Sequence, residues 1–236
     1  ISTMFPRFRR LRLPVIFALI AALMVAACNP DNFRSQAAQV PELVLSILSD
    51  VKTFNYALSQ ESPTIFPYTF KGLITENYIT GKLEGELAKS WEISEDKKQI
   101  IFTMRDDLKW SDGKPLTVDD VVFTFNNIYL NKEIPTDARD VLRVGESKAL
   151  PAVKKIDDKR VEFSTPEPFS PFLRTVGMPI LPAHILQESV KTKDKDGKPK
   201  FLTTWGVDTP PEKVIVNGPY TLERYVTSQR VIFRRN

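Results

Sequence analysis

Residues 91–123 read WEISEDKKQIIFTMRDDLKWSDGKPLTVDDVVF, and this stretch decides the fold. Its first part alternates apolar and polar residues around a polar turn, so that Ile100, Phe102 and Met104 fall on one face. Successive side chains of a strand point to opposite faces, and a hairpin with one solvated face needs this alternation. The pattern therefore predicts a β-hairpin over 91–104.

The second part of the stretch carries the signals of a turn and of a helix start. A short strand with Leu108 and Trp110 is expected to lead into the turn at 111–114, whose glycine tolerates a positive φ. Thr117 and Asp120 then form a Thr-x-x-Asp capping box, which satisfies free backbone amides of a first helical turn. An apolar stripe at helical spacing follows, and we interpret it as core packing rather than as a ligand groove. Its members are Val118, Val121, Val122, Phe125, Ile128 and Tyr129.

Shorter elements of both kinds are expected on either side. Strands or strand pairs are predicted at 42–47, 153–164, 220–225 and 230–234. Helices are predicted at 62–75 and 170–177, where Ser-Pro marks the start, and after Pro182. The charged run 191–200 is interpreted as a solvated loop rather than a phosphate site. Together these elements predict an α/β protein.

The N-terminal region has the three parts of a secretory signal. Arginines precede an apolar run at 13–27, which is too short to span roughly 30 Å of hydrocarbon. Small residues end this run, and the sequence VAAC, which ends at Cys28, resembles a bacterial lipobox. We therefore predict a signal peptide at 1–27, lipidation of Cys28 and a flexible tether at 28–40. The alternatives are a plain signal peptide with an incidental cysteine and an uncleaved anchor helix.

The basic charge of the chain belongs to this signal. The formal charge is +4, and cleavage before Cys28 removes Arg7, Arg9, Arg10 and Arg12. The mature protein is then neutral and has no electrostatic reason to bind nucleic acid. Cys28 is the only cysteine, which excludes disulfides and cysteine-rich metal sites.

A lipid-anchored exported hydrolase is the alternative from another functional class. His184 is the only histidine, so a histidine-based triad must include it, together with a Ser or Cys nucleophile and an orienting acid. Its position near a helix start favours a structural role. Paired carboxylates at 106–107, 119–120 and 157–158 do not make a catalytic pair without spatial convergence. We predict no enzymatic activity, no metal and no cofactor, and a scaffold without any ligand is the third alternative.

Several motifs, in a fixed order, resemble the family 5 extracellular solute-binding proteins, the dipeptide, oligopeptide and nickel receptors of ABC importers. The long run at 87–123 is the most specific of them. Ile-Leu-Pro-Ala-His-Ile-Leu at 180–186, Asn-Gly-Pro-Tyr at 217–220 and Phe-Arg-Arg-Asn at 233–236 follow. The resemblance covers everything after the tether. One departure is Val-Asn at 216–217, where many relatives carry Gly-Thr.

The resemblance implies a two-lobed periplasmic-binding-protein fold of type II with an extra subdomain, of which only the first lobe is expected here. The core of that lobe is expected at 41–60 and 178–236, and the extra subdomain at 61–177, while the second lobe is expected to be absent. The implied mechanism is capture of a solute in the cleft, closure of the lobes and delivery to a permease driven by a separate ATPase.

The resemblance also implies where the solute binds, namely the loop after the first strand and the turn near 217. The expected ligand-binding residues are Ala57, Gln60, Glu61, Ser62, Asn217, Gly218 and Tyr220. A bound peptide is expected to lie extended and to pair its backbone with the protein. The implied partners are a peptide or other small solute, ABC permease subunits and, through the lipid anchor, the membrane. The protein is expected to act as a monomer in the periplasm or on the outer face of the membrane.

Overall fold

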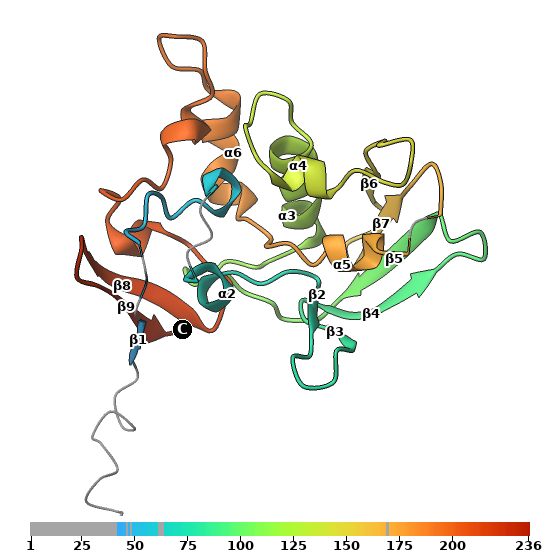
Figure 1. Cartoon of the computed structure of the whole chain (residues 1–236), viewed down its shortest axis with the longest axis horizontal. Helices are drawn as coiled ribbons and strands as arrows, with labels where there is room; N and C mark the ends of the chain where they lie inside the picture. The colour runs from blue at the N-terminus through green and yellow to red at the C-terminus, as the bar shows by residue number, and fades with distance from the viewer. Residues whose placement is uncertain (1–41, 46, 48, 61–63, 169) are drawn as a thin grey trace, which may run out of the picture. The chain divides into compact units, whose positions relative to one another are not determined.

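Four antiparallel strands form the larger sheet of the computed structural model, which describes residues 42–236 apart from 46, 48, 61–63 and 169. Their order is β4-β5-β7-β6, and the strands are β4 (Ala88–Ile93), β5 (Gln99–Met104), β6 (Ala152–Lys155) and β7 (Arg160–Ser164) (Figure 1). Both predicted hairpins are present. Ile100, Phe102 and Met104 are 6%, 0% and 2% exposed, as their alternation predicts.

The helix predicted after Thr117 covers this sheet. It runs as α3 (Val118–Phe123) and continues without a break as a π-helical segment, η4 (Thr124–Tyr129). The capping box is formed, because the Thr117 amide donates to Asp120 Oδ2 at 2.9 Å. Phe125 packs edge-to-face on Phe163 of β7, with ring centroids 4.8 Å apart. The predicted stripe is core, although Val122 is only half-buried.

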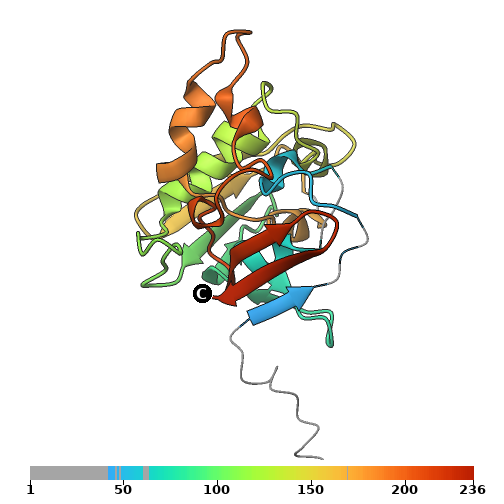
Figure 2. The ribbon, with the colours of Figure 1, turned by 90° about the vertical axis from the view of Figure 1, so that its left-hand side faces the viewer.

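A second sheet joins the beginning and the end of the described chain. β9 (Arg230–Arg235) lies between β1 (Glu42–Leu45) and β8 (Tyr220–Val226), and all neighbours are antiparallel (Figure 2). The last two strands were predicted as a pair. Both sheets share one continuous cluster of buried apolar residues.

Short elements connect the two sheets. They are η3 (Tyr56–Leu58), α2 (Phe66–Thr69), β2 (Ile74–Glu76), β3 (Leu83–Gly85), α4 (Ala138–Val141), α5 (Phe172–Thr175), α6 (Ala183–Lys191), η5 (Lys200–Thr203) and η6 (Pro211–Lys213). β2 and β3 form a separate two-stranded hairpin. None of the helices in the described ranges has the length and apolar character needed to cross a membrane.

The helix predicted at 62–75 is wrong. Among the described residues of that range only α2 is helical, and the chain becomes extended at Phe70. Backbone contacts with distant segments hold the continuation in extended form: Leu73 O accepts from the amides of Glu86 and Ala88, and Lys71 O accepts from Ile180 N. Tertiary hydrogen bonds thus override the local start signal.

Two other expectations are corrected in extent. The short strand at Leu108 and Trp110 is reduced to an isolated bridge between Lys109 and Pro115, because the turn at 111–114 closes the segment on itself through Trp110 N and Lys114 O. α5 covers only four of the residues in the helix predicted at 170–177.

The proposed division into a lobe core and an extra subdomain stays a prediction. The three-stranded sheet falls within 41–60 and 178–236, and the four-stranded sheet within 61–177.

Gly72 marks the tightest crossing between distant segments. A Cβ atom at Gly72 lies 2.1 Å from the carbonyl oxygen of Gly177, a contact that only a backbone shift relieves. We expect Gly72→Ala to lower the free energy of unfolding by about 2–3 kcal/mol, measured by urea denaturation.

Gly206→Ala is the matched control, since its Cβ meets nothing closer than Thr203 O at 3.9 Å. Its unfolding free energy is expected to stay within about 0.5 kcal/mol of the parent. Similar losses in both variants would contradict the steric argument.

Candidate functional site

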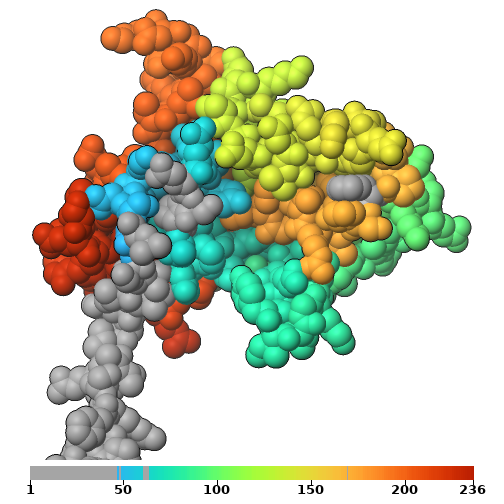
Figure 3. Space-filling view, viewed as in Figure 1, coloured from blue at the N-terminus to red at the C-terminus, as the bar shows by residue number. Residues whose placement is uncertain are grey.

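The candidate site is a pocket of about 480 Å³ between η3, α2 and α4. Figure 3 shows the cyan η3 segment beside the yellow-green α4 segment and next to the teal α2 segment. The lining combines apolar side chains with a few polar groups, which is the usual make-up of a small-molecule site. The lining residues are Tyr56, Ala57, Ser59, Gln60, Thr64, Phe66, Pro67, Thr136, Asp137, Ala138, Val141 and Met178.

A buried asparagine fixes the η3 wall of the pocket. Asn55 is fully buried; its Oδ1 accepts from Ala57 N at 3.1 Å and its Nδ2 donates to Thr204 O at 3.3 Å. The amide of Phe54 donates to Trp205 O at 2.8 Å. These hydrogen bonds fix the loop after β1 to the segment at 204–205. The pocket wall is therefore formed without a bound ligand.

Tyr56 gives this wall a polar group on an apolar ring. The ring packs edge-to-face on Phe66 and on Tyr129, with centroids 5.4 and 6.3 Å away. Burial raises the pKa of Tyr56, so the hydroxyl stays protonated and can donate. Tyr56 is not among the ligand residues expected from the sequence, although it directly precedes Ala57.

The opposite wall is α4, which backbone carbonyls hold in place. Arg139 Nη2 donates to the carbonyl oxygens of Asn131 and Ile134. Thr136 Oγ1 accepts from Ala138 N at 3.3 Å. This arrangement leaves Val141 51% exposed at the pocket, an apolar surface that a bound solute can cover.

The predicted ligand residues that the structure describes separate into two groups. Ala57 and Gln60 line the pocket. Glu61 and Ser62 lie outside the described residues. Asn217, Gly218 and Tyr220 do not line it, and they meet the other end of α2 instead.

That second group forms a backbone junction. Asn217 Oδ1 accepts from Lys71 N at 2.8 Å, and its Nδ2 donates to Lys71 O at 3.3 Å. Gly218 N donates to Thr69 O at 2.8 Å, and a Cβ there lies 2.6 Å from Tyr68 O. The half-buried Tyr220 ring meets Tyr68 edge-on, with centroids 6.3 Å apart. Asn217 and Gly218 thus have structural roles in this lobe, and their assignment as ligand contacts stays a prediction.

His184 lies at a different place, at the start of α6. Its Nε2 is 2.8 Å from Asp112 Oδ2. Burial raises the pKa of Asp112, but hydrogen bonds from His184 and from Lys114 N outweigh this, and the pKa lies below its usual value. Within the described ranges no serine joins the pair, since Ser111 Oγ accepts from Val216 N at 3.1 Å. The triad that the hydrolase alternative requires is not assembled.

The neighbouring Asp120 is a structural carboxylate. It accepts from Thr117 N and from Ala183 N, each at 2.9 Å, and from Trp110 Nε1 at 3.3 Å. Burial raises the pKa of Asp120, and these hydrogen bonds offset the rise only in part. Nor do three or more His, Cys, Asp or Glu side chains gather as metal ligands anywhere in the described part of the chain.

A pocket that combines apolar side chains with a few polar groups, on a mixed α/β fold, has the make-up of a site for a small solute. The comparisons with known proteins identify the family. The family model for the bacterial extracellular solute-binding proteins, family 5 Middle, matches residues 82–236. This chain belongs to that family, which is made up of substrate-binding receptors.

Relatives and solved structures agree with this assignment. A probable ABC transporter-binding protein of Deinococcus radiodurans is 31% identical over 80% of this chain and 31% of its own length. The structure of NikZ from Campylobacter jejuni with Ni(L-His) gives a TM-score of 0.63 at 24% identity, over 79% of this chain and 34% of that one. Haemophilus influenzae OppA, in complex with the peptide RPPGFSPFR, gives 0.62 at 22% identity, over 79% and 36%.

These matches confirm the predicted fold class, an α/β fold that corresponds to part of a two-lobed periplasmic binding protein. The chain spans about a third of the length of the relatives it matches.

Asn217 offers a test between its structural and ligand roles. Asn217→Ala leaves both backbone groups of Lys71 without their side-chain partner, so we expect the free energy of unfolding to fall by about 2 kcal/mol. Chemical denaturation measures the change. Asn127→Ala, at an exposed position of η4, is the control and should have little effect. A fully stable Asn217→Ala protein would refute the structural role.

Proposed function

We propose that this protein is the solute receptor of an ABC importer, and that it captures a peptide or a similar small solute outside the membrane for a permease. The observation that carries the proposal is the preformed pocket at the loop after β1, in a chain that belongs to a receptor family. Its volume falls within the range of small-molecule sites. Enzymatic activity and a cofactor have no place in this mechanism, and the receptor acts as a monomer.

A peptide is the solute class that we favour. The pocket offers an apolar floor at Phe66 and Met178 for a side chain, and Tyr56, Gln60 and Asp137 as polar partners at its walls. An extended peptide presents the same backbone groups whatever its sequence, so such partners give affinity with little side-chain selectivity. OppA of H. influenzae was solved with a peptide, which is consistent with this class.

Calorimetric titration with di- to pentapeptides tests the solute class. If the genomic reading frame continues past Asn236, the protein should be the whole in-frame product. We expect binding heat with at least one peptide, and Val141→Trp should raise the dissociation constant about tenfold, because the indole occupies the pocket mouth. Val207→Trp, at an exposed site outside the pocket, is the matched control.

Two outcomes would contradict this picture. Absence of heat with every peptide would redirect the search to nickel chelates or sugars. Equal weakening by both tryptophan variants would mean that the pocket is not the binding site.

The same proposal includes export and a lipid anchor. Residues 1–27 would be the cleaved signal, Cys28 the lipidated residue and 28–40 the tether, all of them outside the described residues. This places the receptor in the periplasm or on the outer face of the membrane. A permanent anchor keeps the captured solute close to the permease.

Cys28→Ala should abolish incorporation of radioactive fatty acid in the bacterial host, because this cysteine is the only thiol in the chain. Labelling of the parent and the variant is compared after immunoprecipitation. Equal incorporation in the two proteins means that the lipobox assignment is wrong.

A further inference from the structure

The β2–β3 hairpin carries two large apolar side chains at its apex. Tyr78 and Ile79 are 94% and 95% exposed, whereas the next most exposed large apolar residue in the described part is Val141, at 51%. Single apolar residues are common on protein surfaces. Two adjacent ones, both almost fully exposed at the tip of a projecting hairpin, are the kind of feature that contacts another surface.

The apex is held in one conformation. Asn77 Oδ1 accepts from the amides of Ile79 and Thr80 at 3.0 and 3.1 Å, and Gly81 N donates to Asn77 O at 2.8 Å. Gly81 supplies the positive φ of 67° that closes the turn. The two side chains are thus presented outward by a rigid turn, so contact costs little conformational entropy.

The charged side chains beside the apex balance one another. Glu76 is paired with Arg174, and the exposed Glu84 accepts a hydrogen bond from Asn77 Nδ2 at 2.9 Å. Lys82 is exposed too, and neither Glu84 nor Lys82 has an ion-pair partner among the described residues. A tyrosine that combines an apolar ring with a polar hydroxyl, beside an apolar side chain and exposed charges of both signs, suits the headgroup region of a bilayer.

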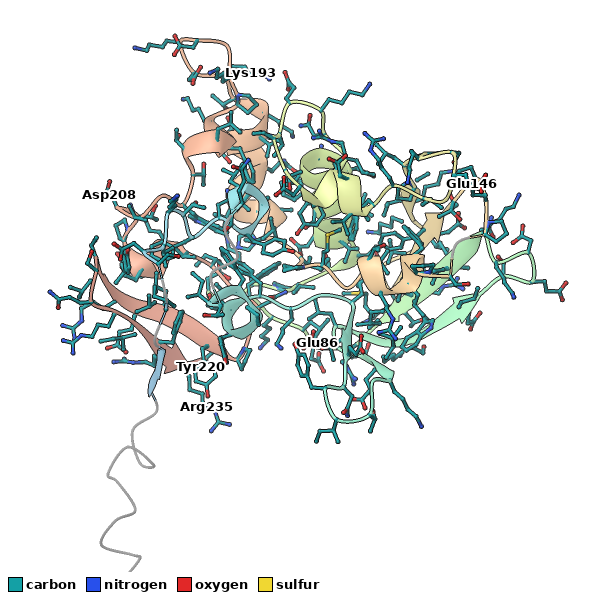
Figure 4. All side chains as sticks on the ribbon, in the orientation of Figure 1. Glu86, Glu146, Lys193, Asp208, Tyr220 and Arg235 are labelled. Carbon is teal, nitrogen blue, oxygen red and sulfur yellow. The ribbon has the colours of Figure 1, made fainter. Side chains whose placement is uncertain are left out.

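The hairpin also projects to the side at which the described chain begins. In Figures 1 and 2, which share a vertical axis, the apex of β2–β3 and the start of β1 at Glu42 both lie at the lower side of the described chain. Figure 4 places Arg235, exposed and without an ion-pair partner in the described ranges, at the same lower side. A lipid at Cys28 is separated from Glu42 by residues 29–41, which reach at most about 50 Å when fully extended.

We propose that the Tyr78–Ile79 apex is a membrane-contact point, which rests on the bilayer surface and orients the receptor above it. The proposal rests on the lipid anchor of the proposed function. Two side chains give only weak binding by themselves, but a tether of this length keeps the apex at a high effective concentration near the bilayer. The anchor then limits the distance between the receptor and the bilayer, and the contact at the apex determines which face of the receptor is turned toward the permease.

The test uses residues 28–236, which contain the compact unit 42–236, coupled through Cys28 to a maleimide lipid in vesicles of phosphatidylethanolamine and phosphatidylglycerol. The synthetic link makes the result independent of natural lipidation. Hydrogen exchange of the peptide at 76–84 should slow several-fold on coupling, compared with the same protein free in solution. The solvated loop at 193–199, on the opposite side in Figure 1, should keep its rate.

Tyr78→Ser with Ile79→Ser should remove the protection, whereas Ile156→Ser, an exposed apolar residue in the β6–β7 turn, should leave it intact. Unchanged exchange at 76–84 in the coupled parent protein would overturn the proposal. Protection that appears only when permease is present in the vesicles would also overturn it, because the contact would then be with protein. Protection with the synthetic link, combined with no fatty-acid label on Cys28 in cells, would support the apex and reject the natural anchor.

Discussion

The carboxylate of Asp120 is the constraint that holds α3, α6 and the loop at Trp110 together. One side chain closes the capping box of α3, accepts from the first amide of α6 at Ala183 and accepts from the indole of Trp110. Trp110 and α3 are near one another in the sequence, whereas Ala183 lies 63 residues after Asp120. A buried carboxylate that lacks its hydrogen-bond donors costs free energy, and so do the donors left without an acceptor. The positions of the three segments therefore depend on one another. The raised pKa of Asp120 is the sign of that burial.

Hydrogen bonds from asparagine side chains also hold the segments around the pocket in place. Asn55 links η3 to the backbone at Thr204. Asn217 and Gly218, which precede β8, link to the C-terminal end of α2. A binding wall held by amide side chains does not need to be ordered by its ligand. The binding energy of a solute is then available for affinity rather than for ordering the loop.

Local pattern was enough to predict the parts of the fold whose stability is local. The two hairpins, the capped helix and the final pair of strands follow from alternation, turn residues and the Thr117–Asp120 box. The helix expected at 62–75 failed because Lys71 and Leu73 make backbone hydrogen bonds to segments that no local pattern connects with them. Two of the residues expected from the sequence, Ala57 and Gln60, line the pocket, and their role as ligand contacts stays a prediction. Tyr56 and the α4 wall with Val141 carry no local signal, since their convergence depends on tertiary packing.

The pairing of β1 with β9 has a consequence for the order of folding. Glu42 is registered with Arg234, so the first described strand has to wait for almost the last residues of this chain before it gains a partner. The four-stranded sheet is built from two hairpins, β4–β5 and β6–β7, and its central pairing of β5 with β7 joins residues much closer in the sequence than Glu42 and Arg234, so it can form while β1 is still unpaired. Contacts between distant residues carry a loop-closure cost and form slowly. β1 therefore stays unpaired until β9 is available, and the three-stranded sheet is the last part of the described fold to close.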